Sequence, residues 1–342
     1  MTRFESGSLP RYILQRVILV IPMIWVILTL VFIMLRVAPG DPVSAALGGK
    51  LDEEALDQRR DALGLNDPIL AQYWDYLSSV LRLDFGTTFS DNQPVLRVVR
   101  DNGGATLTLT VAAFVLALLV GIPLGLLAGR YRDSMPDVLI RLFGILTYAA
   151  PVFFVGYLMQ VYVAQPFGLP TSGQASPITV FTVEPKTHIL LVDAFLSGDN
   201  AAIQDVLKHL ILPAVTLGLL ICGVFIRLVR VNILQTMQSD YVEAAEARGI
   251  SRSKVTRRHS FRNALVPVIT VVGLQFALLL GGAVLTEQTF NWPGLGHKLV
   301  EYINSRDYGA VQGIITVFAV AVVLISLLVD IVNALIDPRV RY

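Results

Sequence analysis

The residues of this chain that are able to do chemistry are few, and their spacing favours neither catalysis nor metal binding. The four histidines have no metal-ligand spacing (His188, His209, His259 and His297). The only Gly-Lys pair, Gly49-Lys50, is followed by leucine, and Ser44 stands where a phosphate-binding loop has its first glycine. No nucleophile, base and acid can be placed together as a triad. We therefore predict no catalytic residue, no metal, no cofactor and no nucleotide site, so the chain is not expected to be an enzyme.

A polar segment with a different kind of chemistry, SDYVEAAEARGIS, occupies residues 239–251 between two long apolar runs. Asp240 precedes Glu243 by three residues, which suits a capped helix start, and the alanines that follow are strong helix formers. Gly249 can end this helix in a left-handed conformation, and Ser251 can cap a second helix through RSKVTRRHSFRNAL. The pattern predicts a unit of helix, glycine turn and helix.

Two interpretations of this unit stay open from its residues alone. In one, Glu243 only caps its own helix, and the neighbouring arginines only fix orientation and bind anionic membrane lipid, at about 1 kcal/mol each. In the other, the small residues around the turn form a compact projection that another protein binds.

The composition places the unit in a membrane protein. Hydrophobic residues make up 54% of the 342 residues and charged residues 15%, whereas soluble domains carry about 25% charged residues. The net charge of +1 gives no basic field that would favour nucleic acid. The single cysteine, Cys222, lies in an apolar run and cannot form an internal disulfide.

Six apolar runs are long enough to cross a bilayer as helices. The first, from Val17 to Leu35, exceeds the length of a signal-peptide core and is predicted to be retained. The others lie at about 104–129, 138–164, 209–229, 264–286 and 312–336. Prolines inside some of the runs predict kinks (Pro22, Pro123, Pro151 and Pro213). The predicted fold class is all-α, with six transmembrane helices.

Charge in the connections predicts the orientation. The 227–263 connection carries eight basic residues against three acidic ones, and the short 130–135 connection holds Arg130 and Arg132. The connections 37–103 and 165–208 are richer in acids than in bases. With six spans all basic connections fall on one side, which the positive-inside rule assigns to the cytoplasm together with both termini. The stretch 287–312 is then expected to be reachable from outside.

The first external loop is predicted to be helical. GLNDPILAQYWDYLSSVLRLDF, residues 64–85, begins with an Asn-Asp-Pro helix-start signal and continues with apolar residues at helical spacing. We expect one or two amphipathic helices here. The chain thus divides into residues 1–36 with the N-terminus and first span, an external loop at 37–103, and a core at 104–342.

The segment EAAEARG, Glu243 to Gly249, resembles the EAA motif of membrane subunits of bacterial ATP-binding-cassette importers. That motif pairs a Glu-Ala-Ala and a following glycine with a downstream Leu-Pro; here Val266 precedes Pro267, at a longer distance. The resemblance implies that a cytoplasmic coupling loop, 230–263, docks on an ATPase. The implied coupling residues are Glu243, Ala244, Ala245, Gly249 and Pro267.

Further stretches resemble the dipeptide/oligopeptide (peptide/nickel) permease branch of that family over nearly the whole chain. They are APGDP at 38–42, HLILPAVTLGL at 209–219, FNWPGLG at 290–296, RDYGAVQG at 306–313 and ALIDPRVRY at 334–342. The resemblance is least clear over 165–208, which is interpreted as an insertion.

The resemblance implies a type I importer permease fold in a bacterial inner membrane, forming half of a pathway for di- or oligopeptides. The implied partners are a second, homologous permease subunit, two cytoplasmic ATP-binding subunits and an extracytoplasmic solute-binding protein. The same machine with nickel or another small solute as cargo is an alternative. An ion-driven secondary transporter is another, but it predicts mid-membrane carboxylates and inverted repeats that are not evident.

The few polar positions within or beside the spans have two interpretations each. Arg141 and Asp330 are expected to form pairs or to reach the membrane surface, with a role in the pathway as the alternative. Gln275, Gly281 and Gly282 are candidates for lining the pathway, against simple helix packing. Trp292 is either an interfacial aromatic anchor or part of a gate-region hairpin.

Overall fold

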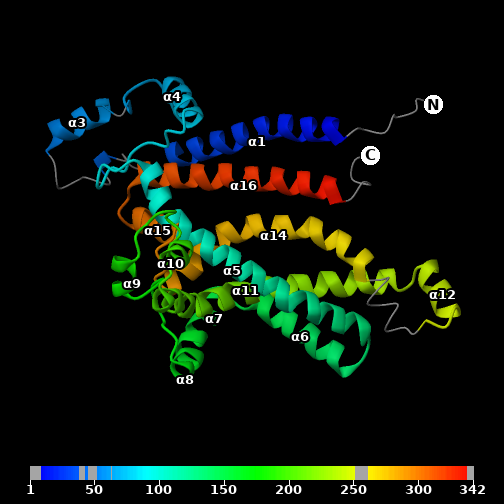
Figure 1. Cartoon of the computed structure of the whole chain (residues 1–342). Coiled ribbons are helices and arrows are strands. Elements are labelled where there is room, and N and C mark those ends of the chain that lie inside the picture. Colours follow the sequence, from blue (N-terminus) through cyan, green and yellow to red (C-terminus); the bar gives the residue numbers. More distant parts are fainter. Residues whose placement is uncertain (1–8, 38–42, 45–51, 63, 251–260, 337–342) are drawn as a thin grey trace, which may run out of the picture.

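The computed structural model describes residues 9–37, 43–44, 52–62, 64–250 and 261–336, which form helices with no strand among them (Figure 1). The first part contains α1 (Leu9–Val37), α3 (Glu53–Ala62), α4 (Ile69–Leu81) and α5 (Val95–Arg130). The middle part contains α6 (Met135–Ala149), α7 (Val152–Leu158), the π-helix η1 (Met159–Ala164), α8 (Gln165–Phe167), α9 (Pro177–Thr182) and α10 (Leu190–Ser197). The last part contains α11 (Asn200–Thr236), α12 (Asp240–Ala247), α14 (Phe261–Thr289), α15 (Leu295–Asn304) and α16 (Tyr308–Ile336).

The predicted all-α class is confirmed, and five of the six predicted apolar runs lie in long helices, whereas the run 138–164 is broken between α6 and α7. Within the described residues, four helices (α1, α5, α11 and α16) are long and apolar enough to cross a membrane. Helix α6 and the segment Val152–Phe167, which comprises α7, η1 and α8, are bent by 107° relative to each other and count as a fifth if they form one span. Helix α14, of 29 residues, covers the expected span 264–286. A total of six spans stays a prediction.

The long helices run between two ends of the molecule (Figure 1). At one end α12 extends beyond the bundle, and the start of α1 and the end of α16 lie toward the same end. Helices α3, α4, α9, α10 and α15 lie toward the opposite end. Helices α1 and α16 lie side by side, with Arg16 Nη1 2.9 Å from Asp330 Oδ2. Asp330 is therefore paired, as expected.

Helix α11 is the central helix, and glycines let its neighbours approach it closely. Gly121, Gly125 and Gly129 follow one face of α5 at intervals of four residues. A Cβ atom at these positions would lie 2.7–2.8 Å from side-chain atoms of Phe225, Val229 and Ile233 of α11, respectively. Small residues at such spacing are the usual means by which membrane helices pack closely.

The predicted helix in the first loop is confirmed as α4, which begins after Pro68. One face packs on α1, where the Tyr73 and Thr29 hydroxyls are 2.7 Å apart. The Tyr76 hydroxyl lies 2.7 Å from Thr316 Oγ1 of α16. Phe32 of α1 contacts both tyrosine rings, at centroid distances of 5.3 and 5.8 Å. Helix α3 is a further helix among the described residues of this loop.

The segment 165–208 forms a small layer with its own apolar cluster. Its core consists of Val183, Ala194, Ala202 and Val206. The buried Asp193 carboxylate accepts hydrogen bonds from the backbone N–H and the hydroxyl of Thr187, both at 2.8 Å. Adjacent to this turn, the carbonyl of His188 contacts Gly104 of α5, where an added Cβ would lie only 2.0 Å from the oxygen. The layer is thus fitted directly against α5.

This contact predicts opposite effects for two adjacent glycines. Gly104→Ala should destabilise the fold by about 1–3 kcal/mol, because backbone must move to admit the methyl group. Gly103→Ala should be neutral or stabilise by up to about 1 kcal/mol, because its Cβ meets only Leu295 Cδ1 at 3.7 Å and Val99 Cγ1 at 4.0 Å while alanine favours the helix. Thermal unfolding of both variants in detergent measures the difference. Equal unfolding temperatures for the two variants would contradict a close contact between Gly104 and the His188 carbonyl.

Candidate functional site

The predicted coupling helix is present as α12, Asp240–Ala247. Its first turn is closed by the backbone N–H groups of Val242 and Glu243, which donate to the Ser239 carbonyl at 2.9 and 3.4 Å. The helix therefore begins one residue earlier than expected, because Asp240 is its first helical residue and not the cap. Helices commonly begin with such a carbonyl at the capping position.

Gly249 ends this helix as predicted. Its φ is +78°, in the left-handed region, and the N–H of Ile250 donates to the Ala245 carbonyl at 3.2 Å. A Cβ at Gly249 would meet nothing within 4 Å, so the requirement for glycine here is conformational and not steric.

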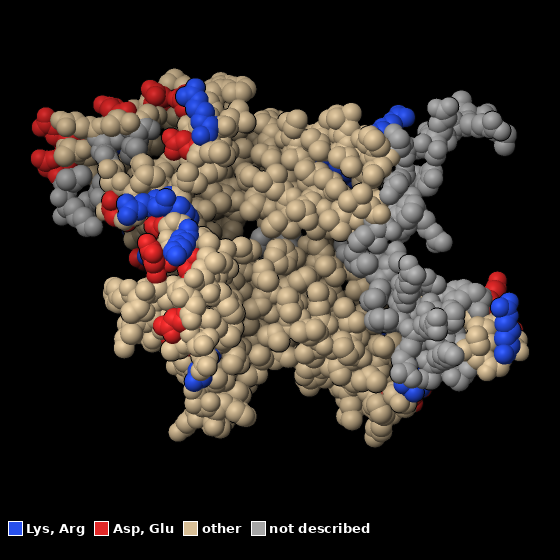
Figure 2. All heavy atoms as spheres, viewed as in Figure 1, with Lys and Arg blue, Asp and Glu red and all other residues tan. Residues whose placement is uncertain are grey.

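The helix presents small and acidic residues outward. Glu243, Ala244 and Gly249 are exposed and Ala245 is half-buried, whereas Val242 is 2% exposed and points inward. Acidic and basic side chains lie on the described residues at this end of the molecule (Figure 2). The exposed residues of α12 thus lie on a projection beyond the bundle, and a Cβ at the glycine turn meets nothing within 4 Å.

The second half of the predicted unit is described only in part. Residues 251–260, with Ser251 and most of the basic run, lie outside the described residues. Helix α14 begins at Phe261 and contains Pro267 six residues into the helix. Its place in the coupling surface stays a prediction.

An ion pair that the sequence did not reveal holds α11, the helix leading to α12. Asp137, fully buried in the first turn of α6, accepts two hydrogen bonds from the Arg230 guanidinium, Nε to Oδ1 at 2.7 Å and Nη2 to Oδ2 at 2.8 Å. The backbone N–H of Asp133 donates to the same carboxylate at 3.0 Å, and Arg141 Nε lies 3.5 Å from it. Arg141 is therefore paired, as expected.

This bidentate pair joins the first turn of α6 to the last turns of α11. Such fork-like pairs fix geometry as well as charge. Because the partners stand 93 residues apart, no local pattern could have matched them. The only signal was that each lies at the polar end of an apolar run.

The candidate pathway residues all lie in α14. Gln275 is half-buried, and Gly281 is exposed with nothing within 4 Å of an added Cβ. Gly282 is in the same helix. Nearby, Gly273 packs tightly on Val329 of α16, where an added Cβ would lie 2.1 Å from a methyl carbon. Close helix packing thus applies to Gly273, whereas Gly281 leaves an open surface.

The FNWPGLG turn is built around a buried carboxylate. Glu287, fully buried, accepts from Thr106 Oγ1 at 2.6 Å and from the His297 N–H at 2.8 Å. Gly294 lies against this carboxylate, with no room for a Cβ. Trp292 is 1% exposed, and its indole N–H donates to the Ala105 carbonyl at 2.9 Å. The interpretation of Trp292 as an interfacial anchor is therefore wrong, because its ring is buried in the protein.

The stretch RDYGAVQG, residues 306–313, contains a second buried carboxylate, that of Asp307. Asp307 Oδ2 accepts from the N–H groups of Phe89 and Ser90 at 2.7 and 2.8 Å. Gly309 lies against the Phe89 ring, where an added Cβ would be 2.8 Å away. In the α15 layer between these two sites, burial raises the pKa of Tyr302 to about 12 and lowers that of His297. Both side chains are thus uncharged at neutral pH.

The histidines are used structurally where the structure describes them. His209 Nδ1 lies 2.9 Å from the Asp205 carbonyl and 3.3 Å from its carboxylate, and His188 Nδ1 lies 3.6 Å from Asp101. No group of three metal-binding side chains occurs within the described ranges.

Comparison with known proteins identifies the family of this chain. The sequence profile of the binding-protein-dependent transport system inner membrane component matches residues 121–342, and that of the N-terminal part of such components matches residues 9–110. The chain belongs to this family and is a membrane component of a transport system.

Individual relatives are similar over almost their whole length. The dipeptide transport system permease protein DppB of Escherichia coli K12 is 36% identical over 335 residues, covering 97% of this chain and 99% of the relative. DppB of Alkalihalophilus pseudofirmus is 34% identical over 332 residues, with the same coverage. The glutathione transport system permease protein GsiC of Salmonella typhimurium LT2 is 33% identical over 332 residues, again with the same coverage.

Proposed function

We propose that this chain is one permease subunit of an ATP-driven importer of di- and oligopeptides, with six spans in a type I fold. The observation that carries the proposal is the exposed helix α12 with its glycine turn, which follows the central helix α11 after a short turn at 237–239. No ATP-binding motif occurs in the sequence, so the energy must come from another chain.

The proposed mechanism is mechanical. The coupling loop 230–263 docks on a cytoplasmic ATPase through Glu243, Ala244, Ala245, Gly249 and Pro267. Movement of α12 is passed to α11, which is packed on α5 through glycines and tied to α6 by Arg230. The bundle then changes between inward- and outward-open states, with an equilibrium set by differences in partner affinity for the two states.

The pathway is proposed to lie between this chain and a second, homologous permease subunit. Gln275, Gly281 and Gly282 line it on α14. The open surface at Gly281 supports this, because a Cβ there meets nothing within 4 Å among the described residues, which leaves the position available to a partner or a solute. An extracytoplasmic binding protein delivers the solute.

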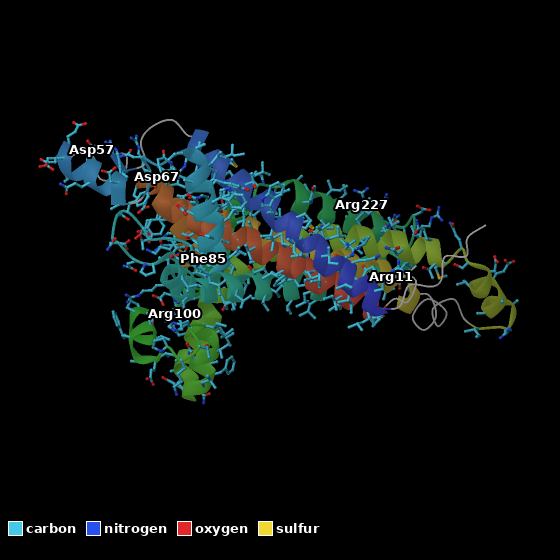
Figure 3. The ribbon with its side chains drawn as sticks, turned by 90° about the horizontal axis from the view of Figure 1, so that it is seen from above. Arg11, Asp57, Asp67, Phe85, Arg100 and Arg227 are labelled. Atoms are coloured by element: carbon cyan, nitrogen blue, oxygen red, sulfur yellow. The ribbon has the colours of Figure 1, made fainter. Side chains whose placement is uncertain are left out.

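The orientation is proposed from charge: the α12 end is cytoplasmic, with both termini there, in a bacterial inner membrane. Arg11 lies toward the α12 end, whereas Asp57 and Asp67 lie at the opposite end (Figure 3). Basic residues favour the cytoplasmic side.

This orientation predicts that a cysteine at Lys298, in α15, is labelled by a membrane-impermeant maleimide added from outside. The native Cys222 is buried and serves as the unlabelled background. A cysteine at Arg248, exposed beyond α12, is the matched control and should react only after the membrane is opened. Labelling of the Lys298 position only from the cytoplasm would overturn the topology.

Purification of the native assembly tests the function and the cargo together. We expect two ATP-binding subunits, a second permease and a peptide-loaded binding protein to accompany the chain. A binding protein loaded with nickel would keep the machine and change the cargo. Solute uptake by this chain alone in vesicles would refute the proposal.

A further inference from the structure

A polar cavity of about 360 Å³ lies between the end of α1, α4, the 83–89 connection and the start of α16. Its volume is in the range of small-molecule sites, roughly 300–1,000 Å³. The side chains that matter below are Arg36, Gln72, Asp75 and Asp84, and aromatic rings of Tyr76, Phe85, Phe89 and Tyr308 complete much of the wall. The cavity belongs neither to the coupling surface nor to the proposed pathway on α14.

Arg36 lines this cavity as a half-buried cation with no counter-charge among the described residues. Its guanidinium lies 5.1 Å from the centre of the Phe32 ring, and its Nε atom is shielded from solvent without a hydrogen-bond partner. Among the described residues it forms no ion pair. Shielded polar groups are nearly always paired, and an unpaired one needs an explanation such as an absent ion or ligand.

Gln72 also has a shielded atom without a hydrogen-bond partner, but in its case the atom is an acceptor. Its amide nitrogen donates to the carbonyls of Leu65 and Asp67 at 3.0 and 2.7 Å, which fixes the side chain. Its Oε1 atom is shielded and has no donor among the described residues. Asp75 and Asp84 line the same cavity and are exposed at its solvent side. The wall thus offers a cation on one helix and acceptors on the neighbouring segments.

We infer that this cavity binds a small zwitterion, with an anionic group at Arg36 and an ammonium group at Gln72 Oε1 and the two aspartates. The headgroup of phosphatidylethanolamine has this chemistry, and so do the two ends of a short peptide. The exposed apolar residues on α4 place hydrocarbon-compatible surface beside the cavity (Ile69, Leu70, Trp74 and Leu81). The cavity lies apart from the proposed pathway on α14, and binding of a phosphatidylethanolamine headgroup there does not depend on which cargo the importer carries.

Native mass spectrometry of the permease–ATPase assembly, held in phosphatidylglycerol nanodiscs without its binding protein, tests the inference. The probes are dioctanoyl phosphatidylethanolamine, dioctanoyl phosphatidic acid, which lacks the amine, and dialanine. We expect one saturable adduct with an amine-bearing probe. Arg36→Gln should weaken it about tenfold or more, as expected for a charge-assisted hydrogen bond. Arg82→Gln, an exposed arginine that does not line the cavity, is the control.

A second variant keeps the inference testable if Arg36→Gln fails to assemble. Asp75→Asn with Asp84→Asn, two exposed changes, should abolish the preference for phosphatidylethanolamine over phosphatidic acid. Binding of the lipid alone or of dialanine alone identifies the source of the zwitterion. Absence of both adducts, or adducts unchanged by both variants, would overturn the inference.

Discussion

Changing Glu243 to alanine together with Gly249 to valine is expected to abolish substrate-stimulated ATP hydrolysis by the assembled importer, while the chain still inserts and assembles its permease pair. Gly249 has a φ of +78°, and a β-branched residue is strained there by about 1–2 kcal/mol. The turn at the end of α12 must therefore change shape. The other substitution removes an exposed charge from the same surface.

Reconstituted vesicles with binding protein and peptide provide the measurement. The matched control is Glu184→Ala with Gly198→Val, which makes the same two changes in the 165–208 layer. Glu184 is exposed, and Gly198 ends α10 with a φ of +71° and nothing within 4 Å of an added Cβ. The control should retain stimulated hydrolysis. If both pairs behave alike, the loss reflects general strain and not coupling.

The second large effect is expected at the pair between Asp137 and Arg230. Arg230→Met leaves a fully buried carboxylate without its bidentate partner, and breaking a buried pair in this way costs about 3–5 kcal/mol. Heat-induced unfolding of the purified assembly should therefore begin at a markedly lower temperature. The double variant Asp137→Leu with Arg230→Met should recover most of this loss, because apolar replacement of both partners is often neutral.

An exposed pair in the adjoining connection is the control. Arg132 and Asp133 form a 3.0 Å contact with their side chains 56% and 73% exposed. Arg132→Met should cost no more than about 1 kcal/mol, since exposed pairs contribute little. If Arg230→Met lowers the unfolding temperature no more than Arg132→Met does, the buried pair does not stabilise the contact between α6 and α11.

The double variant also separates stability from coupling. If the pair transmits movement from α12 through α11, the repaired protein should be stable yet show reduced transport per ATP hydrolysed. An apolar contact lacks the fixed geometry of the bidentate pair.

The long helices were predictable because a bilayer imposes a simple requirement, long apolar stretches that satisfy their own hydrogen bonds. Their ends were not. Helix α5 begins at Val95 and α11 at Asn200, about two turns before the apolar runs at 104 and 209. Those extra turns are stabilised by contacts with other segments, which hydropathy does not record. Pro151 did indicate a break, but its angle of 107° depends on packing.

In the candidate site, too, some features were predictable from local sequence and others were not. The helix ending at Gly249 follows from local rules of propensity and conformation, so it was found. The Asp137–Arg230 pair and the burial of Glu287 depend on residues far apart in sequence. For the same reason the sequence leaves two interpretations of Trp292 open, since the partner of its indole N–H is the carbonyl of Ala105, 187 positions away.

The most direct test of the account is a photo-crosslinking amino acid placed at Ala244, on the exposed face of α12, in the intact assembly purified from membranes. The account predicts a crosslink from this position to an ATP-binding subunit, and none from the same amino acid at exposed Phe181 in α9. An intact, transport-competent assembly in which Ala244 crosslinks to no other subunit would contradict it.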